Sequence, residues 1–251
     1  MTVHTPIDRI WPDPADDLDD DALLEATRFP DDGTWLRVNF ISSLDGAATR
    51  DGVSGGLGDD ADRRLFALLR RPADAVLVGA GTLRDEQYEG LRVDDASVAW
   101  RLAHGMPAHP VLAMVSRSLS IDPGSPLFAD APVRPIVYTV ASAPAARREA
   151  LEAVADVATV GETDADPRRI RDDLTERGLR RIHAEGGPHV FGALLAAGVA
   201  DALHLTLSPT LEAGAAGRIV RGDVTGALPV AARLATVLRS GDELLLSYSL
   251  R

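Results

Sequence analysis

The chain has 251 residues, of which 45% are hydrophobic and 25% are charged, so it is long enough to bury a sizeable core as one α/β domain. A formal net charge of −12 argues against a general affinity for nucleic acid or anionic membranes, and no apolar run is long enough to span a bilayer. The absence of cysteine excludes disulfides, thiolate chemistry and cysteine-ligated metal sites, and we expect no metal centre.

The first 33 residues differ in composition from the rest of the chain. Residues 1–33 are rich in Pro and Asp, and we expect an extension with one short helix around residues 20–27. They lack a basic segment followed by an apolar stretch, so we expect no signal peptide and a cytoplasmic protein. Residues 34–251 are expected to form the folded domain.

From residue 35 onward, predicted strands and helices alternate. A strand is predicted over 35–42, and "DDADRRLFALLRRP" then predicts a helix that Asp59 or Asp60 can cap. The segment "ADAVLVGAGT" is a short continuous apolar run, typical of a strand buried on both faces. The later predicted strands are "HPVLAMVSRS", "RPIVYTV", "VATV", "RRIHAEGG" and "DALHLTLSPTL". The later predicted helices are "SAPAARREALEAVADV", "DPRRIRDDLTERGLR" and "PHVFGALLAAG".

The last twenty residues predict a different unit. The segment "ARLATVLRSGDELLLSYSLR" is predicted to form two strands joined at "SGDE", a hairpin. Repeated β–α alternation predicts an α/β fold with a mostly parallel central sheet flanked by helices, to which the hairpin adds an antiparallel edge. Because "ELLLSYSL" is apolar and an edge of this kind needs cover, we expect a homodimer.

Four predicted strands end in residues suited to bind a ligand, and ligands of open α/β sheets bind beyond the carboxyl ends of the strands. These residues are Asn39, Ser43 and Asp45; Gly79, Gly81 and Thr82; Ser116 and Arg117; and Glu185, Gly186 and Gly187. Taken singly, each group has an ordinary explanation as a turn, a solvated loop or a tight packing contact. Together they fit a bound dinucleotide, although Arg84 stands where the G-x-G-x-x-G fingerprint needs its third glycine.

The spaced motifs S-L-D-G, G-x-x-T and E-G-G-P resemble those of a known family. The segments "NFISSLDGAAT", "ADAVLVGAGTLRDE" and "AEGGPHVFGALLAAGVADALHLTLSP" are similar to the C-terminal reductase domain of the bifunctional riboflavin-biosynthesis deaminase/reductase. The likeness runs from about residue 35 to the C-terminus and implies a dihydrofolate reductase-like fold. It implies NADPH-dependent reduction of 5-amino-6-(5-phosphoribosylamino)uracil. A zinc deaminase of the cytidine type needs cysteines, which this chain lacks.

The resemblance also implies roles for individual residues. The cofactor-binding positions it implies are Gly79, Gly81, Thr82, Arg84, Ser116, Arg117, Gly186 and Gly187. Ser116 and Arg117 match a 2′-phosphate site and favour NADPH over NADH, because arginine binds phosphate through charge-assisted pairs. In the wider fold the peptide between the paired glycines is often cis.

The resemblance places the substrate beside a second group of residues. Asn39 and Ser43 are candidates for holding the substrate, Arg92 for its phosphate, and Asp45 or Glu185 for proton transfer. His183 is expected to point to the face of its strand opposite to Glu185.

The segment "RDEQYEGLRV" departs from the family pattern, so the identity of the substrate is left undecided between alternatives. The family usually continues with an Asp-Asp-Pro segment, whereas here the proline is absent and Tyr88 and Glu89 intrude. A carboxylate of Glu86 or Glu89 near a phosphate is unfavourable unless an arginine offsets it. One alternative is therefore a dihydrofolate or other pterin reductase. Another is a regulatory protein that binds NADPH without turnover.

Overall fold

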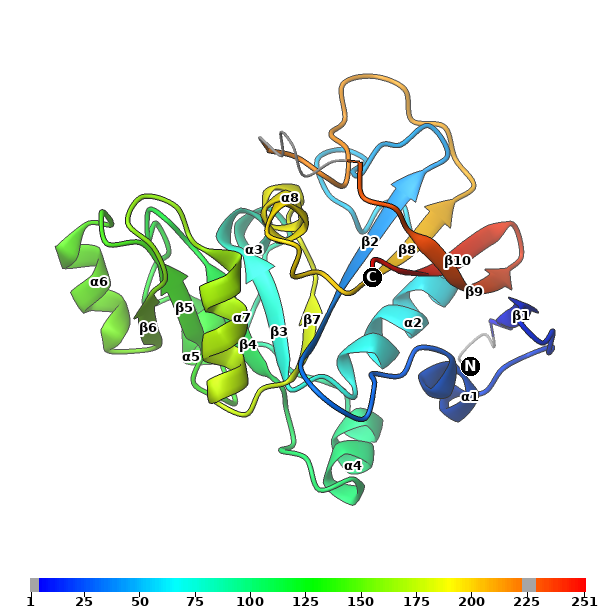
Figure 1. The fold of residues 1–251 in the computed structure, drawn as a ribbon, viewed down its shortest axis with the longest axis horizontal. Helices are drawn as coiled ribbons and strands as arrows, with labels where there is room; N and C mark the ends of the chain where they lie inside the picture. Colours follow the sequence, from blue (N-terminus) through cyan, green and yellow to red (C-terminus); the bar gives the residue numbers. More distant parts are fainter. Residues whose placement is uncertain (1–4, 223–228) are drawn as a thin grey trace.

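The computed structural model describes residues 5–222 and 229–251 (Figure 1). Its strands are β1 (Asp8–Trp11), β2 (Trp35–Ser43), β3 (Ala75–Gly79), β4 (Val111–Val115), β5 (Ile136–Thr139), β6 (Asp156–Thr159), β7 (Arg181–Ala184), β8 (Ala202–Ser208), β9 (Arg233–Ser240) and β10 (Glu243–Ser249). Its helices are α1 (Asp20–Ala26), α2 (Asp60–Arg70), α3 (Ala80–Asp85), α4 (Asp95–Ala103), α5 (Pro126–Ala129), α6 (Ala145–Glu152), α7 (Pro167–Glu176) and α8 (Pro188–Ala196).

One sheet carries the whole fold. Its strand order is β1-β9-β10-β8-β2-β7-β3-β4-β5-β6. The strands from β8 to β6 are all parallel, whereas β10 is antiparallel to β8 and β9, and β1 is antiparallel to β9. The prediction of a mostly parallel sheet with a C-terminal antiparallel hairpin is therefore confirmed.

The position of the hairpin within the sheet corrects one expectation. Strand β10, which contains the apolar run "ELLLSYSL", lies between β8 and β9 and is hydrogen-bonded on both sides, so it is not an edge. The outer side of β9 is in turn covered by β1, a strand of the N-terminal extension that the sequence analysis did not predict. The predicted need for cover at an open edge is met within the chain itself.

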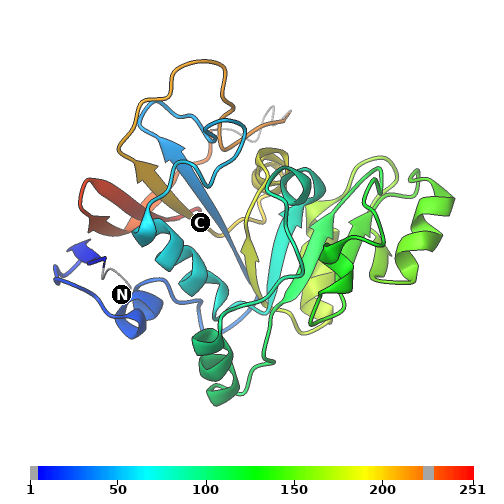
Figure 2. The same cartoon turned by 180° about the vertical axis from the view of Figure 1, so that it is seen from behind.

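Helices cover both faces of the parallel half (Figures 1 and 2). On one face, Ile170 and Leu174 of α7 and Phe191 and Leu194 of α8 pack against buried side chains of β2, β3 and β7. On the other face, β3 and β4 pack against α3, α5 and α6. All five residues of β3 are buried, as the continuous apolar run predicted. The covered parallel strands form a rigid platform whose carboxyl ends lie at one edge.

The N-terminal extension is bound tightly to the domain. Helix α1, which the sequence analysis placed at residues 20–27, packs with α2 and with Leu238 and Leu245 of the hairpin in a separate apolar cluster. Asp20 at the start of α1 pairs with Arg64 and Arg71 of the region around α2. The extension thus supports the helix that carries the side chains described next.

Candidate active site

Four strand ends predicted to hold a ligand lie at one edge of the sheet. Strands β2, β7, β3 and β4 are consecutive and parallel, so their carboxyl ends are adjacent. A cavity of about 750 Å³ opens at this edge. Strand β2 contributes Asn39 to its lining, and helix α2 contributes Asp62, Arg63, Phe66 and Arg70. Thr82 of α3 and residues 85–92 form another part of the lining. Glu185, Gly187 and Pro188 line it from the end of β7.

Glu185 and Arg70 form an ion pair at the inner wall of this cavity. Nε of Arg70 donates to Oε1 of Glu185 at 2.5 Å, and Nη2 donates to Oε2 at 2.7 Å. The Glu185 side chain is 1% exposed and the Arg70 side chain 19%. This charge-assisted bidentate geometry fixes the orientation of the carboxylate and keeps it an acceptor of hydrogen bonds.

Tyr88, in the segment after α3, contacts both members of this pair. Its hydroxyl donates to Oε2 of Glu185 at 2.9 Å, and the Arg70 guanidinium lies 5.7 Å from its ring centroid. Burial, followed by the charge of Glu185, raises the pKa of Tyr88 above its ordinary value, so the phenol stays protonated and donates. Burial alone would lower the pKa of Arg70, but attraction and hydrogen bonding to Glu185 and Tyr88 together outweigh it and raise the pKa, so Arg70 stays charged.

His183 shares a face with Glu185, which corrects the expectation that it points the other way. Nε2 of His183 lies 3.6 Å from Oε1 of Glu185. Side chains alternate between the two faces of a strand, so residues two apart, such as these, lie on the same side. His183 is fully buried and lies behind the carboxylate.

The two glycines after Glu185 form a close junction with α3. The peptide between Gly186 and Gly187 is cis, as the resemblance implied, and the Gly186 carbonyl accepts from the Gly79 amide at 2.8 Å. A Cβ on Gly187 would lie 2.5 Å from Oγ1 of Thr82, and Gly186 has a φ of +99°, which side chains rarely adopt. A side chain at Gly186 would be strained by its backbone conformation, and one at Gly187 would collide with the Thr82 hydroxyl.

The backbone of the residues predicted to hold a dinucleotide is suited to bind one. Gly79 and Gly187 are the N-cap residues of helices α3 and α8. Neither helix start is capped by a side chain of the described residues. The first-turn amides of α3, and those that follow Pro188 in α8, can therefore donate to an anion. Gly81 is exposed and a Cβ there would meet open space, whereas Arg84 lies on the surface and pairs with Asp85.

Ser116 and Arg117 follow β4, one strand further from the cavity. Arg117 is 68% exposed and its Nη1 lies 2.8 Å from Oδ1 of Asp164, itself 76% exposed. Ser116 is buried, and its hydroxyl accepts from the Leu119 amide. The geometry thus leaves the guanidinium of Arg117 available to a phosphate, with Asp164 as its competitor.

The predicted substrate residues divide into two groups. Asn39 and Arg92 line the cavity, and Nη2 of Arg92 donates to the Asp130 carbonyl. Ser43 and Asp45 lie outside the cavity lining. The Ser43 hydroxyl donates to Asp45, and amides of residues 212 and 213 donate to the same carboxylate.

The surroundings of Asp45 suit a structural role better than proton transfer. Its pKa is lowered to about 2, first by the Ser43 hydroxyl and then by the amides of Ala213 and Glu212. A carboxylate with three donors ties the turn after β2 to the segment after β8 and is a poor proton donor at neutral pH. The proton-transfer role of Asp45 stays a prediction that this geometry does not favour.

Arg70 and Tyr88 are the site residues that the sequence analysis missed. Arg70 stands in "LLRRP", where an arginine in the last turn of a helix is ordinary. The signal that could have identified Arg70 is its position in the last turn of α2, next to Leu69, which together with Leu65 marks the buried face of that helix. Tyr88 was noticed only as a departure from the family pattern, and the structure places it on the carboxylate.

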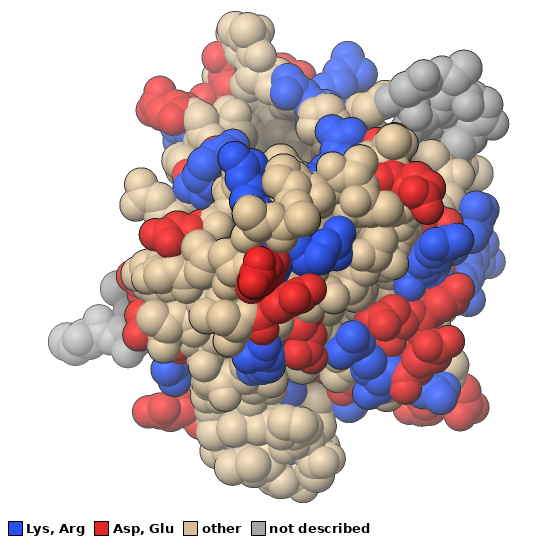
Figure 3. All heavy atoms as spheres, turned by 90° about the vertical axis from the view of Figure 1, so that its left-hand side faces the viewer, with Lys and Arg blue, Asp and Glu red and all other residues tan. Residues whose placement is uncertain are grey.

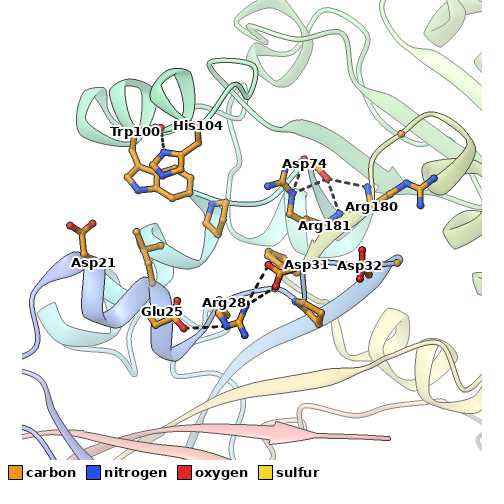
Figure 4. Close-up of a pocket in the computed structure, with 16 residues that line it drawn as sticks. Asp21, Glu25, Arg28, Asp31, Asp32, Asp74, Trp100, His104, Arg180 and Arg181 are labelled. Atoms are coloured by element: carbon orange, nitrogen blue, oxygen red, sulfur yellow. Dashed lines mark hydrogen bonds and ion pairs between the residues drawn. The ribbon is translucent and has the colours of Figure 1, made fainter.

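A second cavity, of about 680 Å³, lies among α1, α4 and the amino ends of β3 and β7 (Figure 4). Several of its charged side chains are paired with one another, Arg181 with Asp74 and Arg28 with Asp31. It lies at the edge of the sheet away from the strand ends that hold Glu185, so we do not assign the reaction to it.

Other classes of site find little support in the described parts of the chain. Seen from the α6 end, acidic and basic side chains are mixed on the face toward the viewer rather than gathered into one basic surface (Figure 3). No helix within residues 5–222 and 229–251 has the length and apolar character needed to cross a bilayer. Within those same ranges, no three His, Asp or Glu side chains are grouped so that they could hold a metal ion.

Comparisons with known proteins found relatives in sequence and in structure. The chain is 27% identical over 224 residues to the 2,5-diamino-6-ribosylamino-4(3H)-pyrimidinone 5′-phosphate reductase of Methanothermobacter thermautotrophicus, covering 86% of this chain and 98% of that protein. It is 25% identical over 182 residues to the enzyme of the same name from Archaeoglobus fulgidus, covering 72% of this chain and 82% of that protein. A solved pyrimidine reductase-like protein from Corynebacterium diphtheriae superposes with a TM-score of 0.79 at 30% identity, covering 86% of this chain and 91% of that one.

The family assignment rests on most of the chain. The sequence profile described as "RibD C-terminal domain" matches residues 34–246, which include every strand from β2 to β9 and the whole cavity lining. The unmatched extension contributes β1 and α1. The chain therefore belongs to the RibD C-terminal domain family.

Proposed function

We propose that this protein is an NADPH-dependent reductase of the riboflavin pathway that opens the ribose ring of a ribosylamino-pyrimidine 5′-phosphate and reduces it to a ribityl chain. The observation that carries the proposal is that Glu185, Thr82 and Gly187 line one cavity. The carboxylate beside the substrate and the glycine junction beside the cofactor thus share one space. The family and the names of the two archaeal relatives support the same reaction class.

The cavity offers separate groups for the two ends of this substrate. Asn39 of β2 lines the cavity and presents an amide that can donate to and accept from a pyrimidine ring. Toward the solvent, Arg63 and Arg92 are exposed cavity arginines. We propose that they hold the 5′-phosphate and offset Glu89. Glu86 is already bound to the Ser54 amide, so its carboxylate is turned to the loop before α2.

The reaction assigns a definite task to Glu185. Reduction adds a hydride to C1′ of the ribose while the bond from C1′ to the ring oxygen breaks and that oxygen takes a proton. Positive charge develops on C1′ and its nitrogen as the ring opens, and a fixed, buried carboxylate stabilises such charge. Because Arg70 and Tyr88 hold Glu185 as an acceptor, we propose that it orients the substrate and stabilises this charge, and that water supplies the proton.

The nicotinamide cofactor supplies the hydride, and this chain positions it. We propose that the first-turn amides of α3 and α8 hold the diphosphate. Gly81, which precedes Thr82 in α3, has open space beside it and leaves room for the diphosphate. We further propose that Arg117 binds the 2′-phosphate and so selects NADPH over NADH. Its exposed guanidinium at the end of β4 supports this choice.

The substrate is tested by following NADPH oxidation with three compounds in parallel. These are 2,5-diamino-6-ribosylamino-4(3H)-pyrimidinone 5′-phosphate, its deaminated uracil counterpart, and dihydrofolate. Each is assayed with the wild type and with Glu185→Gln, and NADPH binding is measured separately by fluorescence. We expect turnover of a ribosylamino-pyrimidine, reduced about 100-fold in the variant. Turnover of dihydrofolate alone, or tight NADPH binding without any turnover, would replace this proposal with the pterin or the regulatory alternative.

We also propose that a second copy of the chain covers one face of β8 and β10. Leu203, Leu205 and Leu207 of β8 and Leu244 and Leu246 of β10 lie on this face and are only half-buried. The buried face of the same strands is mostly polar, with His204 bonded to Ser247, and Leu245 is its apolar member. Among the described elements, Figure 1 shows no helix in front of these strands. A leucine face more exposed than the polar face behind it is typical of a subunit interface.

A further inference from the structure

A buried arginine links the N-terminal extension to the strand beside Glu185. Arg37 on β2 is 1% exposed, and its terminal nitrogens donate to the backbone carbonyls of Thr27 and Leu69. Its guanidinium also lies 4.0 Å from the ring centroid of Phe29. Thr27 and Phe29 precede the residues 34–246 that the family profile matches, so this arginine is held in part by the extension.

Arg37 determines which nitrogen of His183 carries the proton. Its Nε–H faces Nδ1 of His183 at 3.4 Å, and an arginine can only donate. Nδ1 must therefore accept, and a neutral imidazole then carries its proton on Nε2. Burial, followed by the charge of Arg37, lowers the pKa of His183 well below its ordinary value, so the ring is neutral.

The resulting Nε2–H of His183 is directed at Glu185. Nε2 is buried, has no hydrogen-bond partner within the described chain, and lies 3.6 Å from Oε1 of Glu185. That distance is longer than a full hydrogen bond, but such contacts in sites without substrate often shorten when the complex forms. Because a buried donor without a partner is costly, closing this contact is favourable. The other side chains that face the imidazole are Phe66 in edge contact, Arg70 and His204.

We propose that His183 is a positioning residue for the reduction, whose Nε2–H holds Oε1 of Glu185 in the substrate complex, and that Arg37 holds His183 in the tautomer that makes this possible. His183 is fully buried, so it acts through Glu185 and does not touch the substrate. Arg70 and Tyr88 then hold the carboxylate from the cavity side, and His183 holds it from behind. The inference rests on the proposed function, in which Glu185 serves the reaction.

The test compares two substitutions of His183. His183→Leu keeps the volume and removes both nitrogens, whereas His183→Gln keeps an acceptor toward Arg37 and a donor toward Glu185. With the ribosylamino-pyrimidine substrate, we expect kcat to fall about tenfold in His183→Leu and to recover to within about twofold of wild type in His183→Gln. We expect the KM for NADPH to stay unchanged in both, because the contacts of the His183 ring are with Arg37, Phe66 and Glu185 rather than with the two glycines. Equal kcat in all three proteins, or equal loss in both variants, would overturn the proposal.

A matched control separates positioning from stability. His204 is a buried histidine on β8 whose Nδ1 pairs with Ser247, so His204→Leu removes a comparable buried imidazole whose partner is Ser247 rather than Glu185. We expect a lower Tm for His204→Leu with kcat retained, and a loss of kcat in this control would count against a specific role of His183.

The tautomer itself is measured without turnover, by ¹⁵N NMR of the histidine rings, with the His183 signals assigned by their loss in His183→Gln. A proton on Nδ1 instead of Nε2 would overturn the inference even if the enzyme is active. Absence of turnover in the wild type, with the proton found on Nε2, would instead count against the proposed function.

Discussion

Arg70 and Glu185 lie 115 residues apart in the sequence, and they form a bidentate pair of 2.5 and 2.7 Å at the inner wall of the cavity. Arg70 ends α2 and Glu185 follows β7, so the pair joins a helix on one face of the sheet to a strand end. The guanidinium also lies 4.4 Å from the ring centroid of Phe66, which packs behind it. The site thus contains a carboxylate that is already oriented by Arg70 before any substrate binds.

Replacing Arg70 by methionine should damage both stability and catalysis. It leaves the Glu185 carboxylate buried without its cation, which costs about 3 kcal/mol of unfolding free energy. We expect kcat/KM to fall about 100-fold, because the carboxylate loses its orientation. Urea unfolding and steady-state kinetics measure the two effects. The double variant Arg70→Met/Glu185→Leu should regain most of the stability and none of the activity; additive losses of stability would show that the two side chains do not interact.

Tyr88→Phe tests the smaller contribution of the phenol. The variant keeps the ring beside Arg70 and removes one donor to Glu185, so we expect kcat to fall about fivefold and the unfolding free energy by about 1 kcal/mol. Tyr138→Phe is the matched control, since its hydroxyl donates to Asp173 at 2.6 Å in another part of the sheet. It should lose similar stability and keep kcat. A similar kcat for both variants would exclude a role of Tyr88 in the reaction.

The parallel strands and their carboxyl ends could be predicted from the sequence because the patterns that identify them are local. Continuous apolar runs such as the one in β3 identify strands buried on both faces, and small or polar residues directly after them identify a ligand edge. Gly186 and Gly187 were predicted as cofactor-binding positions, which stays a prediction, and the structure shows Phe40 close to Gly186 and Thr82 close to Gly187. Strand ends could therefore be placed without knowing any contact between distant residues.

The parts that were missed depend on contacts between distant segments. Nothing in "DRIW" indicates a strand, because β1 exists only by pairing with β9, more than two hundred residues later in the chain. Arg37 occupies an inward position of β2, where a charged side chain is unexpected, and it is tolerated because Thr27 and Leu69 supply carbonyls. The partners of Glu185 come from α2 and from the segment after α3, and sequence spacing does not reveal that they meet.

Arg117→Ala tests the choice of cofactor. If Arg117 binds the 2′-phosphate, the KM for NADPH should rise by about tenfold or more while the KM for NADH stays unchanged. Asp164→Asn should lower the KM for NADPH, because it removes the carboxylate that pairs with Arg117 at 2.8 Å. Arg134→Ala, at a surface arginine paired with Asp156, is the control and should alter neither value. Equal effects on both cofactors would place the 2′-phosphate elsewhere.

Leu246→Arg tests the proposed dimer. The substitution places a charge in the centre of the half-buried leucine face of β8 and β10, and we expect it to convert dimers into monomers. Leu211→Arg is the control, because Leu211 is 74% exposed and lies beyond the end of β8. Light scattering after size exclusion measures the mass of each variant. A monomeric wild type would refute the second-copy proposal directly.

Glu243 gives the protein a pH-dependent stability whose sign can be stated in advance. It is 2% exposed at the start of β10, and burial, followed by the neighbouring carboxylate of Asp59, raises its pKa to about 8. In the unfolded chain the same group ionises near its ordinary value of 4.5. Between these two values the folded state binds more protons than the unfolded state, so the unfolding free energy falls as the pH rises.

Glu243→Gln isolates this group, because it keeps the shape of the protonated acid and cannot ionise. We expect the variant and the wild type to be about equally stable near pH 5, and the variant to be more stable by roughly 2–4 kcal/mol near pH 9. Asp242→Asn removes one carboxylate from the adjacent exposed turn and should leave the pH dependence of the wild type unchanged. Urea unfolding across this range gives both differences, and parallel curves for the wild type and Glu243→Gln would mean that Glu243 is already ionised in the folded protein at neutral pH.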